Sequence, residues 1–225
     1  MMNLLNLPSI RESVSTKLLL FLPATIIVFL LFCSITSKYE QVNIISGNFL
    51  GGEQRNYYGK DAPDQLSVIW KLQLGCSYTV YPNKNRDIVS MCGAGWTGQS
   101  LVISDKDETY LIQGAYDYGL RKINADNGQV EWKYDFDDVI KSTGSFWVNP
   151  NKQEDDPDKY VIFQGSRLGF RNRINDAVIP SYRAVSFRTG EELWRYNVRK
   201  GPSYSRDVDG SAILLDDTLF IGLEN

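Results

Sequence analysis

The sequence contains no histidine and only three cysteines among its 225 residues. The absence of histidine excludes Ser-His-Asp and Cys-His nucleophilic machinery and every zinc site that uses histidine. It leaves carboxylate chemistry and quinone-cofactor chemistry open. The cysteines are Cys33, Cys76 and Cys92. Because no two of them have CxxC spacing, a thiolate metal site is not expected.

The sequence also lacks an excess of positive charge. Its formal net charge is -3, and nucleic-acid binding needs a concentrated basic surface, so no nucleic-acid partner is expected. Aromatic residues, in contrast, are plentiful, with 13 Tyr, 10 Phe and 5 Trp. Aromatic side chains favour strands. The length suffices for one domain and a targeting segment.

One long apolar run lies near the N-terminus. Residues 18–37 carry no charge and lie between Lys17 and Lys38. A helix of that length spans about 30 Å, the thickness of the hydrocarbon core of a bilayer. Arg11 and Lys17 precede the run, so we expect residues 1–17 to stay in the cytoplasm. Residues 18–37 are therefore predicted to be a transmembrane anchor or a signal peptide.

Either fate would export the rest of the chain to the bacterial periplasm or the cell surface. Cys76 and Cys92 would then lie in an oxidising compartment. They are 16 positions apart, so a disulfide between them would contribute about 3 kcal/mol at most. Two buried free thiols are the alternative, and the sequence leaves both open.

A repeated motif follows the apolar run. Residues 123–136 and 185–198 each contain a glycine, Gly128 or Gly190, and a tryptophan four positions later, Trp132 or Trp194. Apolar and polar residues alternate after each glycine, which is the period of a strand. The glycines lie in two-residue turn signals. Each copy is therefore predicted to be a β-hairpin.

A third, weaker copy surrounds Trp70 and lacks the glycine. The intervals from Trp70 to Trp132 and from Trp132 to Trp194 are both 62 residues, and equal spacing indicates repeated units. Further strands are predicted at residues 100–104, 110–114, 119–124, 145–149, 160–164, 182–187, 211–215 and 218–223. No helical periodicity follows the apolar run.

The motifs ADNGQVEW (residues 125–132) and SFRTGEELW (residues 186–194) resemble the pyrroloquinoline-quinone-like, tryptophan-docking repeats of β-propellers. The resemblance covers residues 56–225. It implies an all-β domain of four-stranded antiparallel blades around an axis, with each tryptophan docking between neighbouring blades. Residues 61–225 are accordingly expected to form a partial propeller of two to three blades, after a linker at residues 38–60.

Propellers have 4 to 8 blades, more than this sequence contains. We therefore expect a chain that is truncated relative to a full ring. Assembly of a ring from several chains is the alternative.

The resemblance also bears on function. Quinone-dependent dehydrogenases of this superfamily bind the quinone with calcium and usually carry two adjacent cysteines, which this sequence lacks. No residue maps onto the family's catalytic aspartate. We expect a non-enzymatic binding or scaffold module without a cofactor, whose partner is a protein or a glycan. The alternatives are the N-terminal part of a quinoprotein dehydrogenase, with pyrroloquinoline quinone (PQQ) and calcium, and a carbohydrate-binding propeller.

One candidate metal site lies in the sequence Asp207-Val208-Asp209-Gly210. Alternating carboxylates resemble the start of a calcium loop. The third alternating ligand is absent, because Ser211 follows Gly210. A tight turn before a strand is the competing interpretation of Asp207 and Asp209.

Overall fold

The computed structural model describes residues 42–57, 59, 62–81, 87–95, 97–167, 178–199 and 207–223. All of them belong to one compact unit, Glu40–Asn225. The predicted anchor at residues 18–37 lies outside the described residues. Within the described ranges, no helix is long and apolar enough to cross a membrane.

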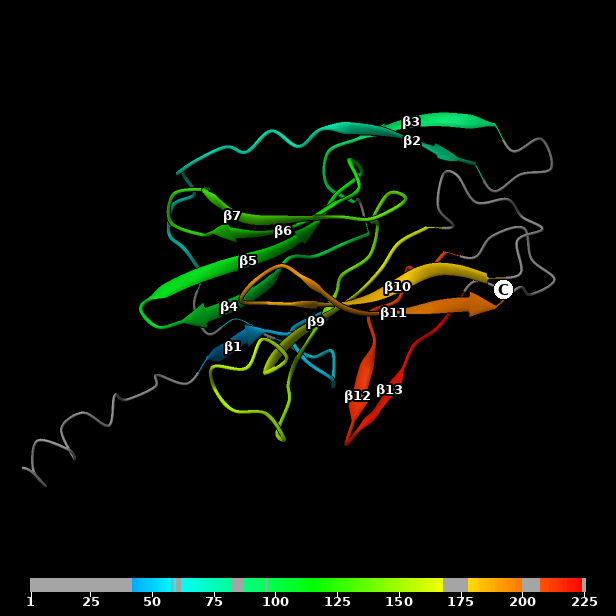
Figure 1. The fold of residues 1–225 in the computed structure, drawn as a ribbon. Coiled ribbons are helices and arrows are strands. Elements are labelled where there is room, and N and C mark those ends of the chain that lie inside the picture. Colours follow the sequence, from blue (N-terminus) through cyan, green and yellow to red (C-terminus); the bar gives the residue numbers. More distant parts are fainter. Residues whose placement is uncertain are drawn as a thin grey trace, which may run out of the picture. The chain divides into compact units, whose positions relative to one another are not determined.

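The described part of the chain is all-β and antiparallel, as predicted, and contains no helix (Figure 1). Its strands are β1 (Asn43–Ser46), β2 (Cys76–Val80), β3 (Ile88–Cys92), β4 (Leu101–Asp105), β5 (Glu108–Gly114), β6 (Gly119–Asn124), β7 (Val130–Asp135), β8 (Ser145–Val148), β9 (Tyr160–Gly165), β10 (Val178–Ser186), β11 (Glu192–Arg199), β12 (Ile213–Leu215) and β13 (Thr218–Phe220).

The first sheet has five strands in the order β1-β4-β5-β6-β7. Strands β6 and β7 form the first predicted hairpin, and Gly128 lies in its turn with φ of 76°. Glycine populates this left-handed region without the steric cost of a side chain. The Gly128 N–H donates to the carbonyl of Asn124 over 2.9 Å and closes the turn.

The second sheet has four strands in the order β11-β10-β9-β8, so neighbours in sequence are neighbours in space. Its outer hairpin, β10–β11, is the second predicted copy. Gly190 has φ of 74°, and its N–H donates to the carbonyl of Ser186 over 2.9 Å. The two hairpins thus share one turn geometry, which confirms that the repeated glycines mark equivalent positions.

The two sheets pack against each other through one hydrophobic cluster. Leu101, Ile103 and Leu120 of the first sheet are fully buried in it, as are Ile162 and Phe187 of the second-sheet side. Full burial of such a side chain stabilises the fold by roughly 1.5–3 kcal/mol. This cluster is called the first interface below.

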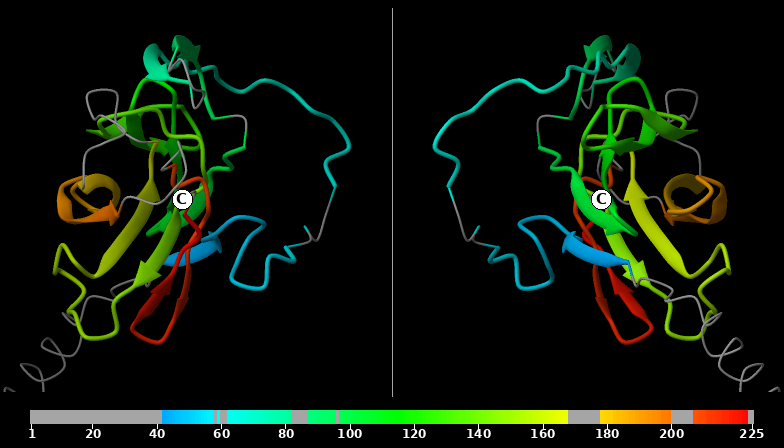
Figure 2. Two further views of the ribbon diagram at one scale, coloured as in Figure 1. Left: turned by 90° about the vertical axis from the view of Figure 1, so that its right-hand side faces the viewer. Right: turned by 90° about the vertical axis from the view of Figure 1, so that its left-hand side faces the viewer.

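A second hydrophobic cluster covers the opposite face of the second sheet. Val161, Phe163 and Ala184 are buried there, together with Ala212, next to Leu214 and Leu219 of the short β12–β13 hairpin. Figure 2 shows the sheets and this hairpin (red) from two sides. Among the described residues, the two strands β12 and β13 form the sheet at this second interface, compared with five strands at the first.

The structure differs from the sequence prediction in residues 38–60, which we assigned to a linker. Residues 43–46 form β1, which pairs with β4 and extends the first sheet to five strands. Val42, Ser46 and Asn48 are buried. Only four residues long and exposed at its first three positions, β1 carries too little alternation to be recognised from sequence.

The segment around Trp70 also differs. Residues 65–75 are assigned to no strand, although their alternation predicted one. Leu66, Val68 and Ile69 are exposed, because no described strand pairs with this segment. In Figure 2 the segment (cyan) arches away from the sheets before it reaches β2. Strands β2 and β3, which we did not predict, form a separate two-stranded sheet.

Candidate functional site

The repeated tryptophans join one unit to the next. The indole N–H of Trp132, on β7, donates to the carbonyl of Phe187 over 3.0 Å. A Cβ atom on Gly190 would lie 2.7 Å from Cδ2 of the same indole. The ring therefore lies directly on the β10–β11 turn, and a residue larger than glycine would collide with it.

Trp70 makes the same contact one repeat earlier. Its indole N–H donates to the carbonyl of Ala125 over 2.7 Å, and a Cβ atom on Gly128 would lie 2.8 Å from its ring. In both contacts the accepting carbonyl lies 55 residues after the tryptophan. Two equivalent contacts at one interval show that the repeated glycine and tryptophan are complementary parts of one interface.

Trp194 is the third member of the series, and no such turn covers it among the described residues. Its side chain is 43% exposed. The ring contacts Phe163 and Tyr182, with centroids 5.6 and 6.4 Å away. The neighbouring Tyr196 is exposed as well. The outer edge of the second sheet is therefore an uncovered aromatic surface.

Cys76 and Cys92 are joined by a disulfide across the β2–β3 hairpin. The sequence left this pairing open. The two residues lie directly opposite each other in the register, which places their side chains on the same face. The disulfide fixes a hairpin whose outward face carries the exposed Tyr78 and Ile88.

The two candidate metal ligands lie in an ion-pair cluster. Asp207 accepts from Nε of Arg167 over 2.7 Å and from Nζ of Lys141 over 3.1 Å, and Asp209 accepts from the same Nζ over 2.5 Å. Burial opposes the charge of Lys141, but hydrogen bonds to Asp209 and Asp207 outweigh it and raise the lysine pKa. The two carboxylates thus bind cationic side chains.

No group of three or more His, Cys, Asp or Glu side chains gathers around Asp207 and Asp209, or anywhere else in the described ranges, in a way that could hold a metal ion. The segment is held by a long-range hydrogen bond, since Val208 N–H donates to the carbonyl of Ser166 over 3.1 Å.

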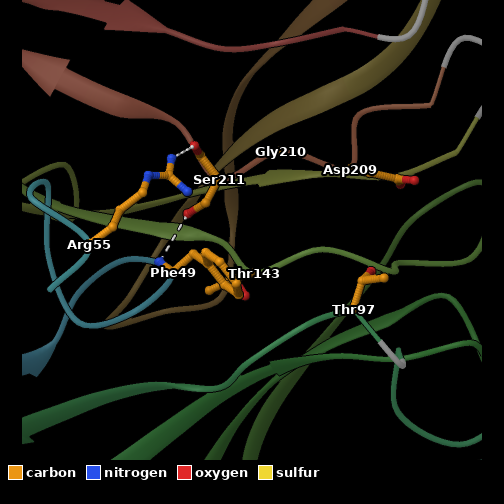
Figure 3. A pocket seen from close by; sticks show the side chains of 7 residues that line it. All are labelled: Phe49, Arg55, Thr97, Thr143, Asp209, Gly210 and Ser211. Atoms are coloured by element: carbon orange, nitrogen blue, oxygen red, sulfur yellow. Dashed lines mark hydrogen bonds between the residues drawn. The ribbon is translucent and has the colours of Figure 1, made fainter. Parts of the chain in front are cut away.

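A pocket of about 260 Å³ lies beside this cluster (Figure 3). It forms where four segments that are distant in sequence meet. Two threonines that each precede a glycine contribute to it, Thr97 from the segment before β4 and Thr143 from the segment before β8, and the segment before β12 contributes Asp209, Gly210 and Ser211. The complete lining is Phe49, Arg55, Thr97, Thr143, Asp209, Gly210 and Ser211.

The loop of residues 47–57 supplies Phe49 and Arg55 and is fixed over the pocket by long-range hydrogen bonds. The amide of Asn48 donates to the carbonyl of Ala212 over 2.6 Å. A guanidinium N–H of Arg55 donates to the carbonyl of Ser211 over 2.8 Å. The N–H of Phe49 donates to the hydroxyl of Ser211 over 3.3 Å. The position of the loop is thus determined by hydrogen bonds to residues more than 150 positions later in the sequence.

The pocket was not predicted from the sequence, because residues 47–57 were expected to belong to a linker. One signal was present. Thr97-Gly98, Thr143-Gly144 and Asp209-Gly210 each come shortly before a strand, β4, β8 or β12. A polar residue and a glycine at the start of the first strand of three successive units would have indicated that these positions meet.

Comparison with known proteins adds no family to this description: no family model, curated protein or solved structure matches the chain.

Proposed function

We propose that this chain is an exported, membrane-tethered, propeller-like repeat protein that binds or scaffolds a partner and catalyses no reaction. The contact of Trp132 with the turn at Gly190, repeated by Trp70 at Gly128, is the observation that carries the proposal. In it, each unit presents an indole to the turn of the following unit. Units joined in this way form an array in which every sheet needs a neighbour on each face.

The exposed Trp194 supports the same proposal. It stands at the position where an array would continue, and the residue is 43% exposed although its ring contacts Phe163 and Tyr182 of its own sheet. A turn with a glycine in the left-handed region, carrying a carbonyl three residues earlier, would complete the contact. In a partial propeller this turn belongs to the next blade, supplied by the same protein or by another chain of the ring.

Export is supported by the apolar run at residues 18–37 and by the disulfide between Cys76 and Cys92, which persists in oxidising compartments. Thiol alkylation of intact cells before and after reduction tests it. We expect Cys76 and Cys92 to react only after reduction, and a Cys76→Ser, Cys92→Ser variant to show no such change. Reaction of both thiols without reductant would contradict export.

The absence of catalysis is tested with the purified full-length chain, PQQ, calcium and a dye as electron acceptor. We expect no dye reduction with alcohols or sugars, and no change in the melting temperature when PQQ and calcium are added. Quinone-dependent dye reduction would instead favour the quinoprotein dehydrogenase alternative and overturn the proposed role.

A further inference from the structure

We infer that the pocket between the loop of residues 47–57 and the segment before β12 binds a small monocarboxylate through the guanidinium of Arg55. The inference rests on the proposed binding role, since it names the ligand class of a site on the same module. Figure 3 shows Arg55, Phe49, Thr143 and Ser211 around one end of the pocket.

The guanidinium of Arg55 is held in place before any ligand arrives. One of its N–H groups donates to the Ser211 carbonyl over 2.8 Å, and its Cζ lies 5.9 Å from the centroid of the Phe49 ring. A guanidinium has five N–H donors in a planar fork. The contacts described for Arg55 use one, which leaves donors for a carboxylate, the group that this fork binds through two parallel hydrogen bonds.

The backbone of Arg55 provides independent support. Its φ of 53° lies in the left-handed region, which costs a residue with a side chain on the order of 1 kcal/mol or more. Leu50 in the same loop has φ of 57°. Hydrogen bonds from Arg55 N–H to Gly52 and from Tyr57 N–H to Leu50, each 3.0 Å long, hold the strained loop. Such strain is concentrated at functional sites, where it positions a side chain.

The charge balance of the pocket favours one negative charge on the ligand. Asp207 and Asp209 are paired with Arg167 and Lys141. Arg55 has no ion pair with any carboxylate of the described residues, so its positive charge is not compensated by a described side chain. Figure 3 shows the carboxylate of Asp209 pointing away from Arg55. A ligand with a single carboxylate would therefore compensate the remaining positive charge.

The rest of the lining limits the size and the polarity of the ligand. A volume of about 260 Å³ is below the roughly 300–1,000 Å³ of pockets for drug-sized ligands. The hydroxyl of Thr143 accepts from the N–H of Gln99 over 2.7 Å, which leaves its proton for a ligand oxygen. The Phe49 ring offers an apolar face. These features fit a sugar acid or a short hydroxy acid, which share the carboxylate and a hydroxyl.

Isothermal titration calorimetry of the full-length chain tests the inference with glucuronate, lactate, glucose and inorganic phosphate. We expect at least one of the two carboxylates to bind, and glucose to bind at least tenfold more weakly than that carboxylate. If glucuronate binds and lactate does not, the ligand is a sugar acid. If lactate binds as tightly as glucuronate, the carboxylate and the hydroxyl are sufficient for recognition. Phosphate binding as tight as the better carboxylate would overturn the ligand class.

Three variants separate the site from the fold. Arg55→Gln is expected to weaken binding of the carboxylate at least tenfold, and Arg55→Lys, which keeps the charge but loses the fork, by a smaller factor. Arg195→Gln is the matched control, since Arg195 is exposed, is paired with Glu192 and does not line the pocket. If Arg55→Gln does not fold, Arg55→Lys carries the test. Equal carboxylate affinity in all variants would overturn the inference.

The failure of this inference is distinguishable from failure of the proposed function. Absence of carboxylate binding by a folded chain that also shows no quinone-dependent dye reduction would overturn the monocarboxylate site alone. Quinone-dependent oxidation of a bound sugar acid would retain the site and overturn the non-enzymatic role.

Discussion

Trp132 and Trp194 occupy the same position in two copies of one motif, yet their surroundings differ. Trp132 lies against the turn at Gly190 and donates its N–H to Phe187. Trp194 is 43% exposed and meets only rings of its own sheet. Both residues lie within a strand, Trp132 in β7 and Trp194 in β11. The motif therefore provides the contact with the following unit, and the hairpin itself forms without that contact.

The largest expected effect separates these two indoles directly. Trp132→Ala removes a docked ring at the first interface and is expected to lower the free energy of unfolding by about 3 kcal/mol, the lower end of the range for buried tryptophan. Trp194→Ala is expected to change it by less than about 1 kcal/mol. Urea unfolding followed by circular dichroism measures both. Equal losses would contradict the assignment of Trp132 to an interface.

The turn that receives the indole provides the second comparison. Gly190→Ala would place a Cβ atom 2.7 Å from the Trp132 ring at φ of 74°, so strain and collision add to about 2 kcal/mol of lost stability. Gly93→Ala is the control, because Gly93 has φ of 84° with nothing within 4 Å of its added Cβ. Its loss is expected to be about 1 kcal/mol. Urea midpoints of the two variants isolate the collision.

A buried lysine, Lys122, makes the stability of the first interface depend on pH. Nζ of Lys122 lies 3.9 Å from the ring centroids of both Tyr110 and Phe187. Burial lowers its pKa from 10.5 to about 8, with Arg188 adding to the decrease and Asp105 opposing it. Between these two pKa values the unfolded chain binds more protons than the folded chain, so stability rises with pH.

From pH 8 to pH 9.5 the gain in unfolding free energy is expected to be about 1.5 kcal/mol. Lys122→Met, which keeps the length of the side chain without a titrating group, should abolish this rise. Above pH 10 the raised pKa values of Tyr134 and Tyr160, both about 12, act in the opposite direction. Urea midpoints measured across the pH range check the prediction, and an unchanged slope in Lys122→Met would contradict it.

The smallest effect concerns the indole N–H alone. Trp132→Phe and Trp70→Phe keep an aromatic ring but lose the donor to Phe187 and Ala125, which should cost about 1 kcal/mol each. Trp194→Phe is expected to cost a few tenths, because no described carbonyl accepts from its indole. Chemical denaturation of the three variants under one condition would show whether Trp132→Phe and Trp70→Phe lose more stability than Trp194→Phe.

Much of the fold could be predicted from local sequence, because period-two alternation and turn glycines are local signals. These signals predict the hairpins that contain Trp132 and Trp194, and the structure confirms them as β6–β7 and β10–β11. β1 escaped prediction because it is short and joins the sheet through β4, far along the chain. The segment at Trp70 has the alternation of a strand but no described partner strand.

The candidate site could be predicted far less well. Asp207 and Asp209 are recognisable in the sequence as alternating carboxylates, but the cationic side chains that pair with them, Lys141 and Arg167, lie 40 or more positions away. Arg55 carries no sequence signature, since its role comes from a left-handed backbone and a contact with Ser211. Distant segments converge to form the pocket, and the sequence marks it only by the polar residue and glycine that come before β4, β8 and β12.

The hydrogen bond from Asn48 to Ala212 spans 164 positions and has a consequence for the order in which the molecule folds. During synthesis, residues 47–57 emerge long before residues 211–212, with which they form hydrogen bonds. Contacts so distant along the chain form late, because the entropy of closing a large loop is lost before they stabilise anything. The loop of residues 47–57 therefore reaches its final position only after both sheets have formed.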